Sequence, residues 1–126
     1  MYKICLNSRD ELLIIDLDKI AFFQANGNYT QMTYIGGDSH LLSIGLAKAE
    51  ELIRLTWPAD RPSPFVRLGR SLMINQNFLS EINIFKQKLV LSDNAEHSYA
   101  LAVPKPLLKD YKDRINELYL RRILKK

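Results

Sequence analysis

The stretch Pro64-Phe65-Val66-Arg67-Leu68-Gly69-Arg70-Ser71-Leu72-Met73-Ile74-Asn75 places two arginines, a serine and an asparagine among apolar residues typical of a buried strand. Arginine presents five donors in a planar fork that suits a phosphate or a guanine edge, and a neighbouring hydroxyl or backbone N–H can hold another phosphate oxygen. Side chains alternate along a strand, so Arg67 and Arg70 reach one duplex only if the chain turns between them, and Gly69 permits that turn. Two interpretations remain: a nucleic-acid contact, or solvated arginines on an edge strand.

The length of the chain, 126 residues, is enough for one domain with a hydrophobic core, and we predict a single domain over residues 1–126. Hydrophobic residues make up 47% of the chain and charged residues 25%, which argues against intrinsic disorder. The longest apolar runs, such as residues 12–15, fall far short of the roughly 18 residues that a membrane-spanning helix needs. The N-terminus has no signal-peptide pattern, so we expect a cytoplasmic protein.

The net charge of +4 is concentrated in two regions. Residues 104–126 contain eight basic and three acidic residues, a net charge of +5, and residues 61–88 have a net charge of +4. The second region is a local basic patch on an otherwise neutral body, which favours an acidic partner such as nucleic acid. The basic residues near the C-terminus are explained either as a solvated helix face or as contacts to a nucleic-acid backbone.

Short apolar or alternating runs bounded by turn residues dominate the chain and predict a mostly β fold. Asn26-Gly27 and Gly36-Gly37-Asp38 tolerate positive φ, and the side chains of Ser92-Asp93-Asn94 can bond to the local backbone, so hairpins are expected at these places. The expected strands are residues 2–6, 12–15, 20–25, 29–35, 40–44, 65–68, 72–74, 80–85, 88–91 and 98–103.

Two segments have helical rather than strand periodicity. Residues 46–56 carry apolar side chains at helical spacing and end before Pro58, which predicts a short amphipathic helix. Residues 107–124 form the expected C-terminal helix. Its apolar stripe consists of Leu108, Tyr111, Ile115 and Leu118.

The sequence contains no recognisable catalytic or metal-binding pattern. His40 and His97 have no partner at metal-ligand spacing, and the glycines do not form a phosphate-binding loop. Ser71 has no histidine near it in sequence that could activate it. Cys5 is the only cysteine, and its place between Ile4 and Leu6 predicts a buried, unpaired thiol. We therefore expect neither an enzyme nor a cofactor.

Several segments, in order and at suitable separations, resemble the LytTR family of bacterial DNA-binding domains. The segment Ile20-Ala21-Phe22-Phe23-Gln24-Ala25-Asn26-Gly27-Asn28-Tyr29-Thr30 and the stretch quoted above carry the most specific part of this resemblance, and residues 46–53 and 101–111 support it. The resemblance extends from about residue 3 to about residue 115. It implies an elongated, mostly β domain of small antiparallel sheets with one short helix and a C-terminal helix.

The resemblance also implies a mode of double-stranded DNA binding in which loops between strands, rather than a recognition helix, enter successive major grooves. Cations beside those loops would neutralise phosphates and give a salt-dependent affinity. The positions that match the family's DNA contacts are Asn28, Tyr29 and Thr30 in the first loop, Arg67, Arg70 and Ser71 in the second, and Lys105 in the last.

The resemblance implies a different role for each matched residue. Thr30 is base-proximal, Arg70 reads a base, and Arg67 and Ser71 contact phosphates. Asn28 either faces the DNA or closes the Asn26-Gly27 turn, and both interpretations stay open. Asn75 also matches the family pattern, and we interpret it as structural, because an asparagine can end a strand through local hydrogen bonds.

The sequence departs from the family pattern at two places. Gly69 stands where histidine is frequent, and the last loop reads Val103-Pro104-Lys105-Pro106 where a serine and a second basic residue are typical. The two prolines fix φ on either side of Lys105 and so affect its direction. These departures leave the target sequence open.

The resemblance implies transcription regulation by a response-regulator output domain of a two-component system, or by a stand-alone regulator. It also implies binding to paired promoter repeats by two copies of the domain. The alternative is a β-rich protein-interaction module that has lost DNA binding and pairs through the helix at residues 107–124. Gly69 and the altered last loop favour this alternative.

Overall fold

The computed structural model describes residues 2–124, which belong to two compact units, Met1–Phe78 and Leu79–Lys126. We call them unit 1 and unit 2 and describe each by itself. The expected single domain over the whole chain stays a prediction. Among the helices of residues 2–124, none combines the length and the apolar character that a membrane-spanning segment requires.

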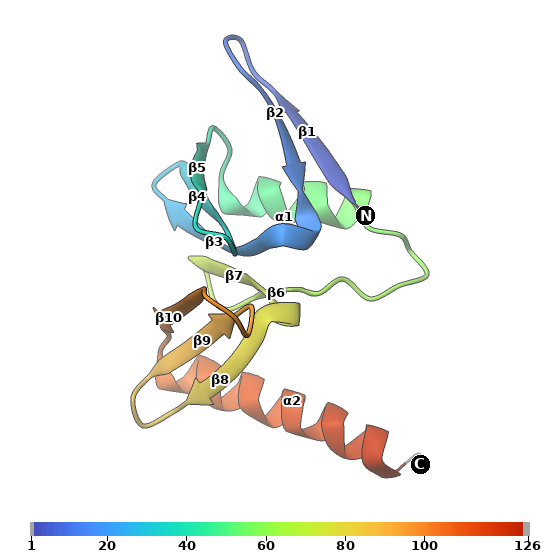
Figure 1. The fold of residues 1–126 in the computed structure, drawn as a ribbon, viewed down its shortest axis with the longest axis vertical. Coiled ribbons are helices and arrows are strands. Elements are labelled where there is room, and N and C mark those ends of the chain that lie inside the picture. Colours follow the sequence, from blue (N-terminus) through green and yellow to red (C-terminus); the bar gives the residue numbers. More distant parts are fainter. Residues whose placement is uncertain (1, 125–126) are drawn as a thin grey trace. The chain divides into compact units, whose positions relative to one another are not determined.

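Unit 1 is built on a five-stranded antiparallel sheet with the strand order β5-β4-β3-β7-β6 (Figure 1). The strands are β3 (Ile20–Asn26), β4 (Tyr29–Tyr34), β5 (Ser39–Leu42), β6 (Phe65–Arg67) and β7 (Leu72–Asn75). The central strand β3 begins with four consecutive buried residues. Four consecutive buried residues mean that both faces of this part of β3 are covered, which explains why the sequence here is a continuous apolar run rather than an alternating one.

A two-stranded sheet and a helix complete the core of unit 1. The sheet pairs β1 (Lys3–Asn7) with β2 (Leu12–Asp16), and the helix is α1 (Leu46–Thr56). Between β2 and β3, residues Leu17–Lys19 form a single 3-10 turn, and Gln76–Phe78 form another after β7. The core cluster consists of Ile15, Leu17, Ile20, Phe23, Met32, Leu42, Leu46, Ile53 and Met73.

Unit 2 is a three-stranded antiparallel sheet with one long helix. The sheet has the order β10-β9-β8 and contains β8 (Leu79–Asn83), β9 (Lys88–Ser92) and β10 (Ser98–Ala102). The helix α2 (Lys105–Leu124) packs against β8. Leu89, Leu91, Leu108 and Tyr111 are buried, and burial raises the pKa of the Tyr111 hydroxyl well above its ordinary value.

The mostly β fold class with a C-terminal helix is confirmed. Each expected strand is found within one or two residues of its predicted bounds, and α1 has the predicted bounds. The helix α2 begins two residues earlier than expected, at Lys105, where the N–H of Leu108 donates to the carbonyl of Pro104. Pro106 is tolerated because the first turn of a helix leaves its N–H groups without intrahelical partners.

Two predictions about burial are wrong. Cys5 is unpaired, as expected, but it is exposed. Side chains of β1 alternate, so Ile4 and Leu6 pack on the core and Cys5 points to the uncovered face of the two-stranded sheet. Leu118, expected in the packed stripe of α2, is 45% exposed.

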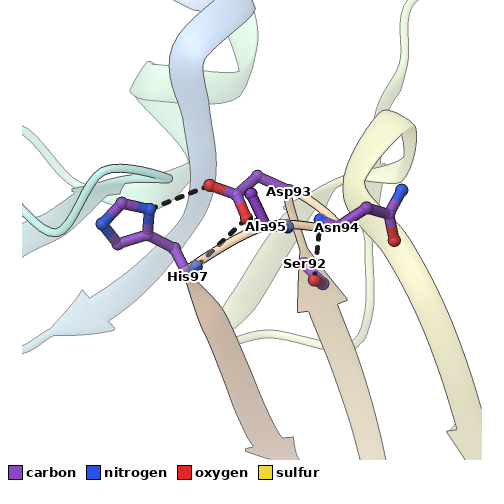
Figure 2. A network of polar contacts seen from close by, with 5 residues as sticks. All are labelled: Ser92, Asp93, Asn94, Ala95 and His97. Atoms are coloured by element: carbon purple, nitrogen blue, oxygen red, sulfur yellow. Dashed lines mark hydrogen bonds and ion pairs between the residues drawn. The ribbon is translucent and has the colours of Figure 1, made fainter.

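The β9–β10 turn of unit 2 contains a polar network around Asp93 (Figure 2). One carboxylate oxygen of Asp93 accepts the N–H groups of Ala95 and His97 at 2.9 and 3.1 Å, and the other lies 2.8 Å from Nδ1 of His97. The His97 hydrogen bond and the two backbone hydrogen bonds lower the pKa of Asp93 from 3.8 to about 2. An ionised carboxylate only accepts, so Nδ1 carries the proton in this contact.

Candidate nucleic-acid interface

The topology of unit 1 brings two polar loops to one end of the five-stranded sheet. The first is the turn between β3 and β4, and the second is the Gly69–Ser71 loop between β6 and β7. Gln24 of β3 is opposite Leu72 of β7, and the N–H of Ala25 donates to the carbonyl of Ser71 at 2.8 Å. The ends of β3 and β7 are therefore joined directly where the two loops begin. Ala25 and Ser71, which are 46 positions apart in sequence, lie next to each other there.

The β3–β4 turn presents two of its residues to solvent. Asn26 pairs with Tyr29, which leaves Gly27 and Asn28 as the two turn residues, and Gly27 has a φ of +60°. Positive φ at this place is typical of a tight hairpin turn and explains the glycine. Asn28 is exposed and Tyr29 is 49% exposed. Asn28 thus closes the turn and is also accessible, so both interpretations of this residue remain compatible with the fold.

Thr30, expected near a base, has a fully buried side chain. Its hydroxyl donates to the carbonyl of Ile44 at 2.8 Å, in the segment that leads from β5 into α1. Alternation along β4 explains this, because Tyr29 points out of the sheet and Thr30 points into it. In this conformation Thr30 holds two segments of unit 1 together and has no surface to offer a base.

The β6–β7 loop turns at Gly69, as the sequence suggested. Gly69 has a φ of +80°, and the N–H of the buried Leu68 donates to the carbonyl of Leu72 at 2.9 Å, which closes a loop of three residues. Arg70 and Ser71 are exposed. Within residues 2–124, neither the Arg70 guanidinium nor the Ser71 hydroxyl has a hydrogen-bond or ion-pair partner. Both groups are available to a ligand at the tip of the loop.

Arg67, expected on a phosphate, is bound inside unit 1. Its Nε donates to the carbonyl of Gly69 at 3.3 Å, and its Nη2 donates to the carbonyl of Arg70 at 3.2 Å. Its Nη1 donates to Oε1 of Glu50 in α1 at 3.1 Å, and only 25% of the side chain is exposed. All three nitrogens of the guanidinium are therefore engaged by the loop and the helix.

Glu50 is the residue of this site that sequence reasoning missed. Glu50 and Glu51 are consecutive residues of α1, and both are exposed. Glu51 pairs with Lys48 on the same helix at 3.7 Å, whereas Glu50 pairs with Arg67, 17 residues away. Helical spacing places Glu50 beside the apolar stripe, four residues after Leu46 and three before Ile53, but only the packing of α1 beside β6 identifies Arg67 as its partner.

Two further residues of the family pattern lie away from the loop tips. Asn75 is fully buried, its Nδ2 donates to the carbonyl of Ile20 at 2.9 Å, and its Oδ1 accepts the N–H of Asn77 at 3.0 Å. Its predicted structural role is confirmed. Lys105 is exposed at the first position of α2 and belongs to unit 2. The cluster of loops described above is therefore formed by unit 1 alone.

The similarity of this chain to known proteins is found in its structure and not in its sequence. No protein-family model matches the chain, and no curated protein matches it. Among solved structures, the chain is similar to the LytTr DNA-binding domain of a protein described as a methyl-accepting/DNA response regulator from Bacillus cereus. The match has a TM-score of 0.58 and 19% sequence identity, and it covers 90% of this chain and 95% of the other. The expected resemblance is confirmed at the level of structure: this chain has the fold of a LytTr DNA-binding domain.

Proposed function

We propose that the protein binds double-stranded DNA in a sequence-specific manner and regulates transcription in a bacterial cytoplasm. The observation that carries the proposal is the junction of β3 and β7, where the hydrogen bond between Ala25 and Ser71 holds the β3–β4 turn beside the Gly69–Ser71 loop. Two adjacent loops that begin at hydrogen-bonded strand ends and have exposed polar tips can approach base edges while neighbouring groups contact phosphates. The fold shared with a LytTr DNA-binding domain supports the same function.

Within this proposal the exposed residues have separate roles. Arg70 at the tip of its loop reads a base edge, Ser71 contacts a phosphate beside it, and Asn28 and Tyr29 contact the DNA from the neighbouring turn. Lys105 contributes a phosphate contact from unit 2. Thr30 is not retained as a contact, because its side chain is buried and hydrogen-bonded.

The proposed site is promoter DNA with paired repeats, occupied by two copies of the domain. The domain acts either alone or as the output part of a response regulator in a two-component system. The proposed activity requires no catalysis, cofactor or small-molecule substrate, because recognition uses hydrogen bonds and charge alone.

A binding titration against DNA from upstream of the protein's own gene, at two salt concentrations, tests the proposal. We expect a complex that prefers this DNA over a random duplex of equal length and weakens steeply with salt. If the protein bound neither duplex at low salt, the proposal would be wrong.

A second candidate function is a protein-interaction module. It is favoured by the outer half of α2, where Leu118, Tyr119 and Leu120 are 45%, 58% and 49% exposed. Exposed apolar side chains on one helix are more frequent at protein interfaces than on a surface that binds no partner. Absence of DNA binding, together with self-association that disappears in Leu118→Ser, would favour this candidate.

A further inference from the structure

In the Gly69–Ser71 loop, all three backbone carbonyls accept hydrogen bonds from neighbouring groups of unit 1. The carbonyls of Gly69 and Arg70 both accept hydrogen bonds from the Arg67 guanidinium, at 3.3 and 3.2 Å. The carbonyl of Ser71 accepts the N–H of Ala25 at 2.8 Å. Every carbonyl of the loop is therefore directed into unit 1 and satisfied there.

The N–H groups of the same peptide units have the opposite direction. The described chain has no cis peptide bond, and in a planar trans peptide the N–H points away from the C=O. The N–H groups of Arg70 and Ser71 therefore point away from the Arg67 guanidinium, on the side of the loop that faces solvent. Neither N–H donates to an acceptor within residues 2–124.

We propose that the N–H groups of Arg70 and Ser71, together with the Ser71 hydroxyl, form an anion site for one phosphate of the DNA backbone. Successive N–H groups that converge on one side of a turn bind anions in proteins generally. Arg67 and Glu50 are positioning residues of this site: the guanidinium turns the two carbonyls inward, and the Glu50 carboxylate holds the guanidinium. The inference rests on the proposed DNA binding and assigns Arg67 a different task from direct phosphate contact.

The two possible tasks of Arg67 predict opposite effects of Glu50. If Arg67 contacted phosphate directly, Glu50 would compete with the phosphate, and its removal would strengthen DNA binding. If Arg67 orders the loop, removal of Glu50 frees the guanidinium and weakens DNA binding. Glu51 provides a matched control, since it is one residue away on α1, is exposed and is paired with Lys48 instead of Arg67.

The first experiment uses the free protein and inorganic phosphate as the probe. Phosphate is titrated at constant ionic strength while backbone amide resonances are followed by NMR in the wild type, Glu50→Ala and Glu51→Ala. We expect the amides of Arg70 and Ser71 to shift most in the wild type and in Glu51→Ala. In Glu50→Ala we expect a roughly tenfold higher dissociation constant, the loss that one charge-assisted hydrogen bond can cause. An absence of shifts at these two amides would overturn the proposed site, and equal behaviour of the two variants would overturn the positioning role of Glu50.

The second experiment compares Arg67→Ala and Arg67→Lys on one duplex over a range of salt concentrations. We expect both variants to bind about tenfold more weakly with an unchanged salt slope, because lysine cannot reproduce a fork that reaches two carbonyls and a carboxylate. A slope that falls by about 0.9 in the alanine variant and returns in the lysine variant would show direct phosphate contact and overturn the inference.

The two experiments separate the possible failures. If the wild type binds no duplex, the proposed function is wrong, and the phosphate titration still decides whether the loop is an anion site. If the wild type binds DNA but Glu50→Ala and Glu51→Ala have equal dissociation constants for phosphate, the proposed function stands and the positioning role of Glu50 is wrong.

Discussion

The β6–β7 loop of unit 1 and the β9–β10 turn of unit 2 are both short connections between antiparallel strands. They differ in which backbone groups a charged side chain binds: carbonyls in the first, N–H groups in the second. In the first, a cation, Arg67, binds carbonyls and leaves N–H groups outward. In the second, an anion, Asp93, accepts the N–H groups of Ala95 and His97, so these donors are no longer available (Figure 2). The charge of the residue that orders a turn thus decides whether the turn offers donors to an anion.

The difference also extends to the exposed side chains. The loop in unit 1 ends in Arg70 and Ser71, whose side chains have no hydrogen-bond or ion-pair partner within residues 2–124. The turn in unit 2 places a carboxylate and an imidazole against each other. We therefore expect the first connection to bind DNA and the second to stabilise its own hairpin. The following predictions test that contrast, from the largest effect to the smallest.

Arg70→Ala should have the largest effect on DNA binding. A bidentate arginine contact to a base edge contributes about 1–3 kcal/mol of specific affinity, and its loss should relax specificity at one base pair. The measurement is a titration of the variant against the preferred and a random duplex. Lys3→Ala, at an exposed position of β1 outside both basic regions, is the control. Similar losses for Arg70→Ala on both duplexes would contradict base reading.

Thr30→Val should reduce the stability of the free protein rather than its DNA specificity. The substitution keeps the shape of the side chain but leaves the carbonyl of Ile44 without its hydrogen bond, which we expect to lower the free energy of unfolding by about 1 kcal/mol. Denaturant unfolding measures this change. Unchanged stability combined with a loss of site preference would return Thr30 to the set of DNA contacts.

The Asp93 network should weaken only in strong acid. The folded-state pKa of Asp93 is about 2, below its ordinary value of 3.8, so its contribution to stability is complete above pH 3.8 and is lost as the pH falls through about 2. Following the carboxyl carbon of Asp93 by NMR against pH should give a midpoint near 2. A midpoint near 4 would mean that the carboxylate does not hold the turn in solution.

Cys5 should react readily with a thiol reagent in the native protein, because it is exposed on β1 and unpaired. The modification should leave the fold and the proposed DNA loops unchanged, since the neighbouring Ile4 and Leu6, not Cys5, face the core. Absorbance of the released thiol product measures the rate. Reaction only after addition of denaturant would show that this face of the β1–β2 sheet is covered in solution.

Local patterns in the sequence were sufficient to predict the strands, the bounds of α1 and the turn at Gly69. Alternation, helical spacing and glycine tolerance are properties of a few neighbouring residues, so they can be seen without the fold. The pattern failed for Leu118 because helical spacing identifies the apolar face of α2 but does not show how far along the helix the sheet covers that face. It failed for Cys5 because an apolar run does not reveal that only one face of a two-stranded sheet is covered.

The sequence by itself determined the secondary structure and the residue types at the two loop tips, because φ preferences and side-chain periodicity act over a few residues. Only the tertiary structure decided which polar side chains those loops can use. Thr30 is bound by Ile44, 14 residues away, and Arg67 by Glu50, 17 residues away. Such pairings depend on how α1 and its preceding segment pack on the sheet, and two neighbouring carboxylates of one helix, Glu50 and Glu51, acquire different partners through that packing.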